Sequence, residues 1–396
     1  MSLISFANRI NAVEEYYFSR KLAEVKTLDK PEKPVINLGI GSPDLAPAEK
    51  VIESLQNSAA KANHHGYQSY KGIPAFRNAI AEFYKSRYNV QLQAETEILP
   101  LVGSKEGIMH ISMAFLNDGD EVLIPDPGYP TYAAATTLAG GIVRTYDLTE
   151  ENNWQIDIDQ LEKQNLSNVK IMWINSPHMP TGSVLNENTL RRLVDLAIRN
   201  QFLLVNDNPY SFILNEHPTS LLALPHANKV CLELNSLSKS HNMAGWRLGW
   251  VCGNKAFIDA IVKVKSNMDS GMFLPLQEAA AVALQQPLAW HQQLNARYAK
   301  RKQVASNLLL QLGCSISAPQ VGLFVWAKVP AHVVDVEKWI DEILYATHVF
   351  ITPGFIFGKN GNRFVRISLC ATENTFAVAQ KRIEEFMLRK MLTEQP

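Results

Sequence analysis

Short runs of hydrophobic residues alternate with amphipathic stretches along the middle of the chain. Each run is bounded by Gly, Pro, Asn or Asp, which is typical of buried β-strands. Between two of the runs, Leu190, Leu193, Val194, Ala197 and Ile198 recur at the spacing of one helix face. Strands that alternate with helices predict an α/β fold with a mainly parallel sheet between helices. The predicted strands cover residues 98–102, 121–124, 141–146, 170–174, 202–206, 230–234 and 248–252.

The pattern changes on both sides of this region. Residues 6–29 predict a helical or part-helical arm, which Pro31 and Pro34 end. After Pro275, long helical stretches precede strands at about 322–329, 348–352 and 364–369, which predicts a smaller α+β domain. We therefore expect three parts: an arm with part of the small domain over 1–47, a large domain over 48–275, and a small C-terminal domain over 276–396.

Composition excludes several classes of protein. The 396 residues are 46% hydrophobic and 19% charged, which suits a folded chain with a large core. Lys plus Arg equals Asp plus Glu at 38 each. Because basic residues are not in excess, the sequence does not predict a nucleic acid or an anionic membrane as a partner. The sequence has no run of 18 or more apolar residues, so it predicts no membrane-spanning helix. Four widely spaced cysteines and a start unlike a secretory signal favour a reduced, cytoplasmic protein.

Polar residues follow five of the predicted strands. Because the carboxyl ends of parallel strands meet at one edge of a sheet, ligands bind there and these residues should lie together. Each segment alone has an ordinary explanation as a helix start, a turn or a core side chain. The segments are Gly103-Ser104-Lys105, Asp126-Pro127-Gly128-Tyr129, Asn175-Ser176-Pro177, Asp207-Asn208-Pro209-Tyr210 and Ser236-Leu237-Ser238-Lys239.

These segments carry the groups that an aldehyde cofactor with a phosphate and a pyridine ring requires. Lys239 can form a Schiff base, although a surface lysine in a Ser-rich loop is the alternative. Asp207, at a buried strand end, can pair with a protonated pyridine nitrogen, or it can cap the next turn. An anion suits the free backbone N–H groups of the helix that begins at Gly103-Ser104-Lys105. The hydroxyls of Ser236 and Ser238 and the guanidinium of Arg247 can bind the same anion. The set predicts pyridoxal 5'-phosphate.

Two aromatic residues suit the ring of this cofactor, and two further residues suit the carboxylate of a substrate. Tyr129 can stack on the ring, and Tyr210 can donate to its phenolic oxygen. Arg366 lies in an otherwise apolar strand and can hold a carboxylate in bidentate fashion, unless it joins the domains through a salt bridge. Gly41 can bring backbone close to that carboxylate. We expect no metal site, and we expect Lys300-Arg301-Lys302 to be a solvated helix face.

Taken together, these motifs resemble a known family. Ser236-Leu237-Ser238-Lys239 followed by Gly245-Trp246-Arg247-Leu248-Gly249, with Asp207 and Tyr210 before and Arg366 after, is similar to the class I pyridoxal-phosphate aminotransferases of the aspartate aminotransferase fold, which is fold type I. The similarity runs from about residue 34 to residue 390. It implies that Lys239 forms the Schiff base and that Asp207 pairs with the pyridinium. It also implies that Tyr67 reaches the phosphate of a neighbouring subunit, and hence a homodimer with shared active sites.

Within the family, Gly103-Ser104-Lys105-Glu106-Gly107-Ile108 and Asn242-Met243-Ala244-Gly245-Trp246-Arg247 most resemble the branch of LL-diaminopimelate and alanine aminotransferases. The resemblance implies ping-pong transfer of an amino group from an L-amino acid to a 2-oxo acid, 2-oxoglutarate or pyruvate. LL-diaminopimelate, alanine and aspartate are candidate donors. A carbon–sulfur β-lyase on the same fold and a low-activity cofactor-binding protein are the alternatives.

One position departs from the family. The usual Asn-Pro-Thr-Gly is Met179-Pro180-Thr181-Gly182 in this chain, and a thioether cannot donate the hydrogen bond that the asparagine gives to the ring oxygen. Asn175 lies four positions earlier and is not its equivalent. We therefore expect Tyr210 to carry more of that interaction and the Lys239 Schiff base to hold its proton more tightly. The residues that contact the substrate side chain are not evident, although the arm is a candidate for closing over it.

Overall fold

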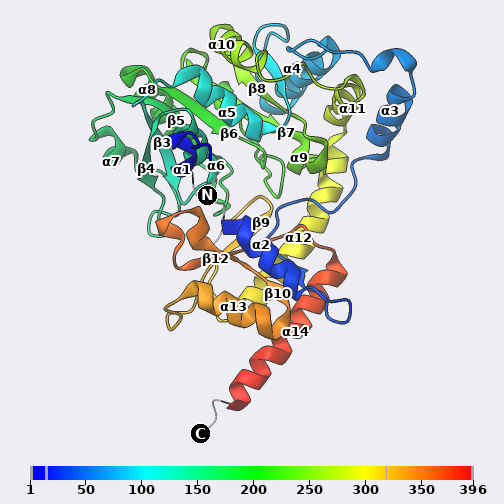
Figure 1. Ribbon diagram of the computed structural model, residues 1–396, viewed down its shortest axis with the longest axis vertical. Coiled ribbons are helices and arrows are strands. Elements are labelled where there is room, and N and C mark those ends of the chain that lie inside the picture. Colours follow the sequence, from blue (N-terminus) through cyan, green and yellow to red (C-terminus); the bar gives the residue numbers. More distant parts are fainter. Residues whose placement is uncertain (1–2, 14–16, 318, 394–396) are drawn as a thin grey trace.

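The computed structural model of the protein describes residues 3–13, 17–317 and 319–393, and its upper part is built around a seven-stranded sheet (Figure 1). The strand order is β2-β8-β7-β6-β5-β3-β4, and among these strands only β8 runs antiparallel to the rest. The prediction of a mainly parallel sheet is confirmed. The strands are β2 (Ile98–Leu101), β3 (Glu121–Asp126), β4 (Ile142–Asp147), β5 (Val169–Ile174), β6 (Leu203–Asp207), β7 (Cys231–Ser236) and β8 (Gly249–Gly253).

The central strands β5, β6 and β7 are buried along almost their whole length because helices cover both faces of the sheet. In β5, Ile171 and Trp173 belong to one hydrophobic cluster, whereas Met172 and Ile174 belong to another. Alternate side chains of a strand point to opposite faces, so each set packs on a different layer of helices. One layer contains α5 (Ser104–Phe115), α6 (Thr131–Leu138) and α10 (Lys255–Lys265), and the other contains α7 (Ile158–Glu162) and α8 (Glu187–Asn200).

A third group of helices covers the end of the sheet at β2 and β8. It comprises α3 (Glu49–Ala59), α4 (Pro74–Tyr88) and α11 (Leu274–Leu284), which share one hydrophobic cluster that includes Phe76, Ile80 and Ala280. We had expected the small domain to begin at residue 276. Because α11 packs on α3 and α4, we propose instead that the change of domain falls at the start of α12 (Leu288–Gln311).

The lower part of the molecule is the smaller α+β unit. Its sheet has the order β11-β12-β9 and is antiparallel, and a separate parallel pair joins β1 (Ile36–Asn37) to β10 (Val349–Phe350). The ring of Trp326 stacks on Phe364 at 5.1 Å between centroids and ties neighbouring strands together. The remaining elements are β9 (Phe324–Lys328), β11 (Thr352–Pro353), β12 (Phe364–Ser368), α13 (Val336–Thr347) and α14 (Glu373–Thr393).

The N-terminal arm contains α1 (Asn8–Asn11) and α2 (Tyr17–Leu28), so the part-helical prediction for residues 6–29 is confirmed outside residues 14–16, which lie beyond the described ranges. Phe18 and Val25 of α2 pack on Leu344 and Phe350 of the small domain. Helix α2 therefore belongs to the lower part of the molecule, in front of which it runs in Figure 1, whereas α1 lies against α6 in the upper part.

Among the helices of the described residues, none is long and apolar enough to cross a membrane. All four cysteines are free thiols, and three of them are buried.

Candidate active site

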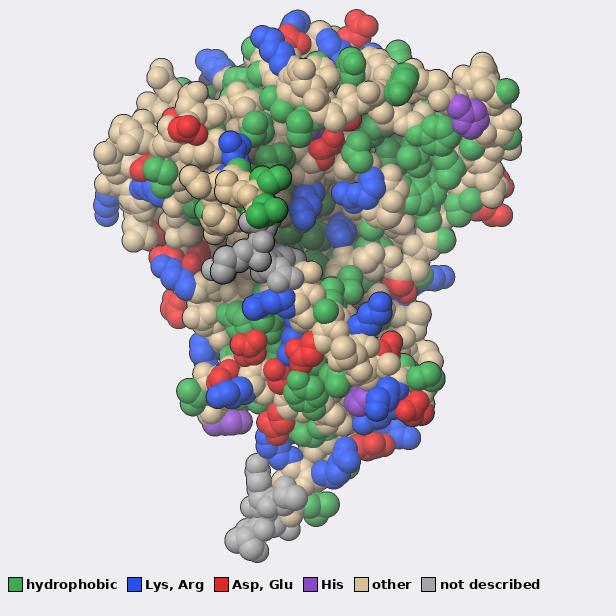
Figure 2. Space-filling model, in the orientation of Figure 1, with side chains coloured by type: hydrophobic (Ala, Val, Ile, Leu, Met, Phe, Trp, Pro, Cys, Tyr) green, Lys and Arg blue, Asp and Glu red, His purple; other side chains and the backbone are tan. Residues whose placement is uncertain are grey.

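A pocket of about 500 Å³ lies at the carboxyl ends of the parallel strands, between the upper and lower parts of the molecule. Figure 2 shows a hollow there with Lys and Arg side chains gathered in and around it. Every residue that the sequence predicted for the site lines this pocket except Tyr67. They are Gly41, Ser104, Lys105, Tyr129, Asp207, Tyr210, Ser236, Ser238, Lys239, Arg247 and Arg366.

The start of α5 forms one end of the pocket. Its N-cap residue, Gly103, has a φ of 83° and no capping side chain, so the first N–H groups of the helix face the pocket without a side-chain acceptor. A Cβ at residue 103 would collide with Nη2 of Arg247, so only glycine lets this guanidinium lie on the turn. Free N–H groups, the helix dipole and a cation together suit a phosphate.

The carboxylate of Asp207 is buried at the end of β6. Its Oδ2 accepts from the hydroxyl of Tyr132 at 2.9 Å, while Oδ1 has no hydrogen-bond partner among the described residues. Burial raises the pKa of Asp207 to about 6, against the smaller opposing effect of the Tyr132 hydrogen bond. A buried carboxylate oxygen without a partner is costly, and a protonated pyridine nitrogen would satisfy it. The residues present therefore fit pyridoxal phosphate.

Lys239 lies in α9 (Leu237–Ser240), directly after β7. Its ammonium group donates to the backbone carbonyl of Gly41, which comes from a segment nearly two hundred positions away. Burial lowers the pKa of Lys239, the Cys370 thiol opposes this shift, and the positive charges of Arg366 and Arg247 reinforce it. A lysine whose neutral form is favoured is suited to nucleophilic and proton-transfer chemistry.

Arg366, in the middle of β12, lies between two aromatic rings. Its guanidinium carbon is 4.0 Å from the ring centroid of Phe324 and 4.6 Å from that of Phe357. Nη2 donates to the carbonyl of Gly39 at 2.8 Å, and Nη1 lies 3.1 Å from the sulfur of Met179. Rings on both faces fix the plane of the guanidinium, which is the condition for bidentate binding of a carboxylate.

Asn175 and Met179 line the same wall. The amide of Asn175 donates to the carbonyl of Asp207 at 2.5 Å and accepts from the N–H of Met179 at 2.7 Å. Asn175 thus binds backbone on both sides, which agrees with the expectation that it does not replace the missing asparagine. The thioether of Met179 contacts Arg366 instead. Burial raises the pKa of Tyr210 well above its usual range, so its hydroxyl stays a donor at neutral pH.

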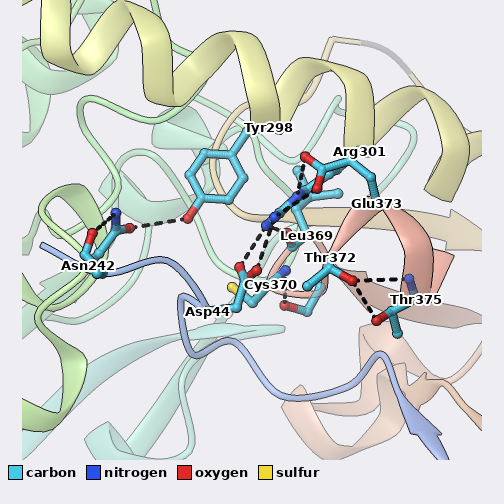
Figure 3. Close-up of polar contacts among 11 residues, drawn as sticks. Asp44, Asn242, Tyr298, Arg301, Leu369, Cys370, Thr372, Glu373 and Thr375 are labelled. Carbon is cyan, nitrogen blue, oxygen red and sulfur yellow. Dashed lines mark hydrogen bonds and ion pairs between the residues drawn. The ribbon is translucent and has the colours of Figure 1, made fainter.

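Arg301, on α12, corrects one expectation. We predicted a solvated helix face for residues 300–302, but Arg301 is only 1% exposed. It donates to Asp44 at 2.6 and 3.0 Å and to Glu373 at 3.3 Å, and Figure 3 shows it between these two carboxylates. The same helix brings the hydroxyl of Tyr298 to Oδ1 of Asn242 at 3.5 Å. Arg301 therefore holds the segment after Gly41 through Asp44, and Tyr298 of the same helix contacts the loop after Lys239 through Asn242.

Tyr67 lies outside the pocket of its own chain and is 93% exposed. The loop that carries it lies against Gly271, which has a φ of 85°, and a Cβ at residue 271 would collide with the backbone of Gln68 and Ser69. The role in a neighbouring subunit that the family resemblance implies stays a prediction.

Several residues of the site were not found from the sequence. Tyr132, Phe324, Phe357, Phe18 and Leu22 all line the pocket. Tyr132 comes three positions after Tyr129 at the start of α6, so its place near Asp207 was open to inference from helix spacing. The others are ordinary apolar residues of elements that meet only in the folded chain.

One group of possible metal ligands lies elsewhere. Ligand atoms of Glu106, His110 and Asp269 lie within 4.8 Å of one another. The ammonium of Lys265 forms an ion pair with Asp269. A lysine therefore already supplies positive charge at this cluster, and we assign no metal to it.

Comparison with known proteins identifies the family. The pattern of aminotransferase class I and II matches residues 33–383, so the chain belongs to that family. It is a pyridoxal-phosphate-dependent aminotransferase of fold type I, as the sequence motifs predicted.

Several relatives and solved structures are similar to the chain over nearly its whole length. The LL-diaminopimelate aminotransferase of Natranaerobius thermophilus is 38% identical over 382 residues, covering 96% of this chain and 99% of that protein. That of Aquifex aeolicus is 36% identical and covers 98% and 100%. A substrate-bound structure of BacF from Bacillus subtilis has a TM-score of 0.91 and 32% identity and covers 98% of each chain. The aspartate aminotransferase of Thermotoga maritima has a TM-score of 0.89 and 28% identity and covers 97% and 100%.

Proposed function

We propose that the pocket transfers an amino group between an L-amino acid and a 2-oxo acid in a ping-pong reaction, with Lys239 as the covalent catalyst. Pyridoxal phosphate, when bound, supplies a ring that withdraws electrons from the α-carbon of the substrate. The observation that carries the assignment is the unpartnered Oδ1 of Asp207, buried in the same pocket as Lys239 and Arg366.

The residues divide into three proposed roles. Arg366 and the backbone at Gly41 hold the α-carboxylate, which orients the α-carbon toward the nitrogen of Lys239. Asp207 pairs with the ring nitrogen, Tyr210 donates to the ring oxygen, and Tyr129 packs on the ring. The phosphate is held at the start of α5 and beside the Lys239 turn by Ser104, Lys105, Ser236, Ser238 and Arg247.

In the proton-transfer step, Lys239 is the base and later the acid. Its lowered pKa makes the neutral amine accessible, and that amine would take the proton from the α-carbon of the substrate. The resulting ammonium would then give a proton to the former aldehyde carbon of the cofactor, on the other side of the substrate nitrogen. The arm helix and the small domain cover this side of the pocket, which keeps water from the reacting atoms.

The homodimer and the role of Tyr67 are part of the proposal. The exposure of Tyr67 supports it, because a 93% exposed tyrosine is placed to meet another chain. Tyr67→Phe is expected to weaken cofactor binding about tenfold, while sedimentation shows an unchanged dimer. A monomer at micromolar concentration would refute this arrangement. The cytoplasmic location stays a prediction.

Lys239→Ala tests the assignment directly. The variant is expected to lose both the visible band that borohydride reduces and all transamination with 2-oxoglutarate or pyruvate. Lys229→Ala, an exposed lysine just before β7, is the matched control and should keep both. Activity or a reducible band in Lys239→Ala would overturn the proposal. Release of ammonia and pyruvate without any 2-oxo acid would instead indicate a β-lyase.

LL-diaminopimelate, alanine and aspartate are candidate donors. The first is the substrate in the names of the relatives above, and the other two follow from the resemblance to neighbouring branches. Steady-state rates with each donor, and with 2-oxoglutarate and pyruvate as acceptors, rank them.

A further inference from the structure

A short segment of backbone, residues 38–44, lies between two charged groups of the site. The carbonyl of Gly39 accepts from Nη2 of Arg366 at 2.8 Å, and the carbonyl of Gly41 accepts from the ammonium of Lys239. Arg366 comes from β12 in the lower part of the molecule, whereas Lys239 comes from α9 in the upper part. The position of this segment therefore bears on one group from each part.

Gly41 lies where a larger residue would not fit. A Cβ at residue 41 would be 2.5 Å from the ring of Phe324, and the guanidinium carbon of Arg366 lies 4.0 Å from the centroid of the same ring. The backbone of Gly41 and the fork of Arg366 therefore share one aromatic neighbour. Glycine gives the backbone more freedom than other residues do, and the segment has two, so the place of Gly41 depends on how the ends of the segment are held.

One end of the segment is held by hydrogen bonds to its backbone. The carbonyl of Leu38 accepts from the N–H of Ser368, the last residue of β12, at 2.7 Å. Oδ1 of Asn37 accepts from the N–H groups of Gly39 and Ile40 at 2.9 and 3.3 Å. These bonds hold the segment as far as Ile40 and leave the part after it to other contacts.

The other end is held by an ion pair with α12. Nη1 and Nη2 of Arg301 donate to the two oxygens of Asp44 at 2.6 and 3.0 Å, so two bonds fix the carboxylate. Nη1 also donates to the carbonyl of Leu369, the residue after β12, at 3.1 Å. Figure 3 shows Arg301 with Asp44 on one side and Glu373 on the other. Both ends of the segment are thus tied to the carboxyl end of β12, the strand that carries Arg366.

We propose that Asp44 and Arg301 are positioning residues for the substrate carboxylate. Their ion pair fixes the segment against β12 and so sets the separation between the backbone of Gly41 and the guanidinium of Arg366. One carboxylate can meet both groups only over a narrow range of separations. Neither Asp44 nor Arg301 is among the described residues that line the pocket, so both act through Gly41. The inference rests on the proposed function, which assigns the carboxylate to Arg366 and Gly41.

Two substitutions form a matched pair, because Arg301 binds two carboxylates. Asp44→Asn removes the partner on the segment, whereas Glu373→Gln removes the partner on α14, whose side chain is 56% exposed. Each variant loses one negative charge and leaves Arg301 with one carboxylate. Only Asp44→Asn weakens the attachment of the segment.

Binding of an unreactive 2-oxo acid measures the effect on the carboxylate site. In the pyridoxal form, the loaded protein has no amino group to transfer, so it binds 2-oxoglutarate or pyruvate without reaction. We expect the dissociation constant from calorimetry to rise about tenfold in Asp44→Asn and to change by less than about twofold in Glu373→Gln. Equal effects of the two substitutions, or no effect of Asp44→Asn, would overturn the inference. A parent protein that binds neither acid would contradict the proposed function and the inference with it.

A longer side chain separates the position of the segment from its charge. Asp44→Glu keeps the carboxylate and adds one methylene group, so the ion pair can form only with the segment displaced. We expect its affinity for the 2-oxo acid to fall between those of the parent and Asp44→Asn. If Asp44→Glu binds the acid as tightly as the parent does, the ion pair supplies charge alone and the positioning role fails.

Hydrogen exchange reports on the same segment without the cofactor. In the cofactor-free protein, the backbone amide hydrogens within residues 39–44 should exchange faster in Asp44→Asn than in the parent, and at the rate of the parent in Glu373→Gln. Unchanged exchange in Asp44→Asn, or faster exchange with unchanged binding of the acid, would overturn the inference. Failure of the proposed function shows differently, because the parent then transfers no amino group to either acid, whatever the exchange rates are.

Discussion

Replacing Asp207 by Asn should stabilise the cofactor-free protein but weaken its binding of pyridoxal phosphate. The carboxylate is buried at the end of β6, and Oδ1 has no partner among the described residues. Without a cofactor this charge is a cost to the fold, and an amide of nearly the same shape removes the cost. With a cofactor the carboxylate has a cationic partner, and its removal is harmful.

The magnitude follows from the pKa of Asp207. Burial raises that pKa from 3.8 to about 6, and each unit corresponds to 1.36 kcal/mol, so the ionised form costs the folded protein about 3 kcal/mol. The folded state holds the proton more tightly than the unfolded state between these two values. The stability linked to Asp207 is therefore full below about pH 4 and is lost as the pH rises through 6. About half of the loss falls above pH 5, because the unfolded group is already mostly ionised there.

Urea unfolding of the cofactor-free protein at several pH values measures this change. We expect Asp207→Asn to be more stable than the parent by about 3 kcal/mol at pH 8, with the difference shrinking as the pH falls toward 5. Asp195→Asn, on the exposed surface of α8, controls for the loss of a carboxylate and should show no such trend. In the loaded protein, Asp207→Asn should bind pyridoxal phosphate about a hundredfold more weakly, because a buried charge loses its partner.

Two results would refute this reasoning. If the empty variant is less stable than the parent at pH 8, the Asp207 carboxylate is not a cost to the fold. If cofactor affinity is unchanged, Asp207 does not pair with the ring.

Three further substitutions test neighbouring contacts. Tyr132→Phe removes the hydrogen bond that lowers the pKa of Asp207, so the pH at which the empty protein loses stability should move upward in the same urea series; an unchanged midpoint would contradict this. Arg366→Lys keeps the charge but loses the planar fork between two rings, so kcat/KM should fall about 10- to 100-fold while the visible cofactor band stays the same, and a loss of that band would point to a structural role. Met179→Asn restores a donor to the ring oxygen, so the pH midpoint of the visible band should fall relative to both the parent and Met179→Leu; a higher midpoint would refute the role assigned to Met179.

The local patterns of the sequence were enough to predict the sheet. The central strands are short and rich in apolar residues because both faces of the sheet are covered, and Gly, Pro, Asn and Asp mark where most of them end. The predicted strand at 170–174 became Val169–Ile174, and the one at 202–206 became Leu203–Asp207. Small errors at the ends are expected, since ends depend on local hydrogen bonds more than on periodicity.

The same patterns did not predict the contacts made by residues far apart in the chain. Arg301 looked like part of a solvated cluster because it stands between two lysines, yet α12 buries it against Asp44 and Glu373. The contact of Met179 with Arg366 joins positions nearly two hundred residues apart. No local periodicity records such a pairing.

The sequence by itself determined the order of strands and helices and the chemical groups that follow each strand. Because parallel strands end at one edge, it also determined that Ser104, Tyr129, Asp207 and Lys239 would meet. Only the tertiary structure decided what closes the other side of the pocket. The small domain brings Arg366 between two rings and α2 lays apolar side chains on the opening, because packing between distant elements, rather than local propensity, sets their positions.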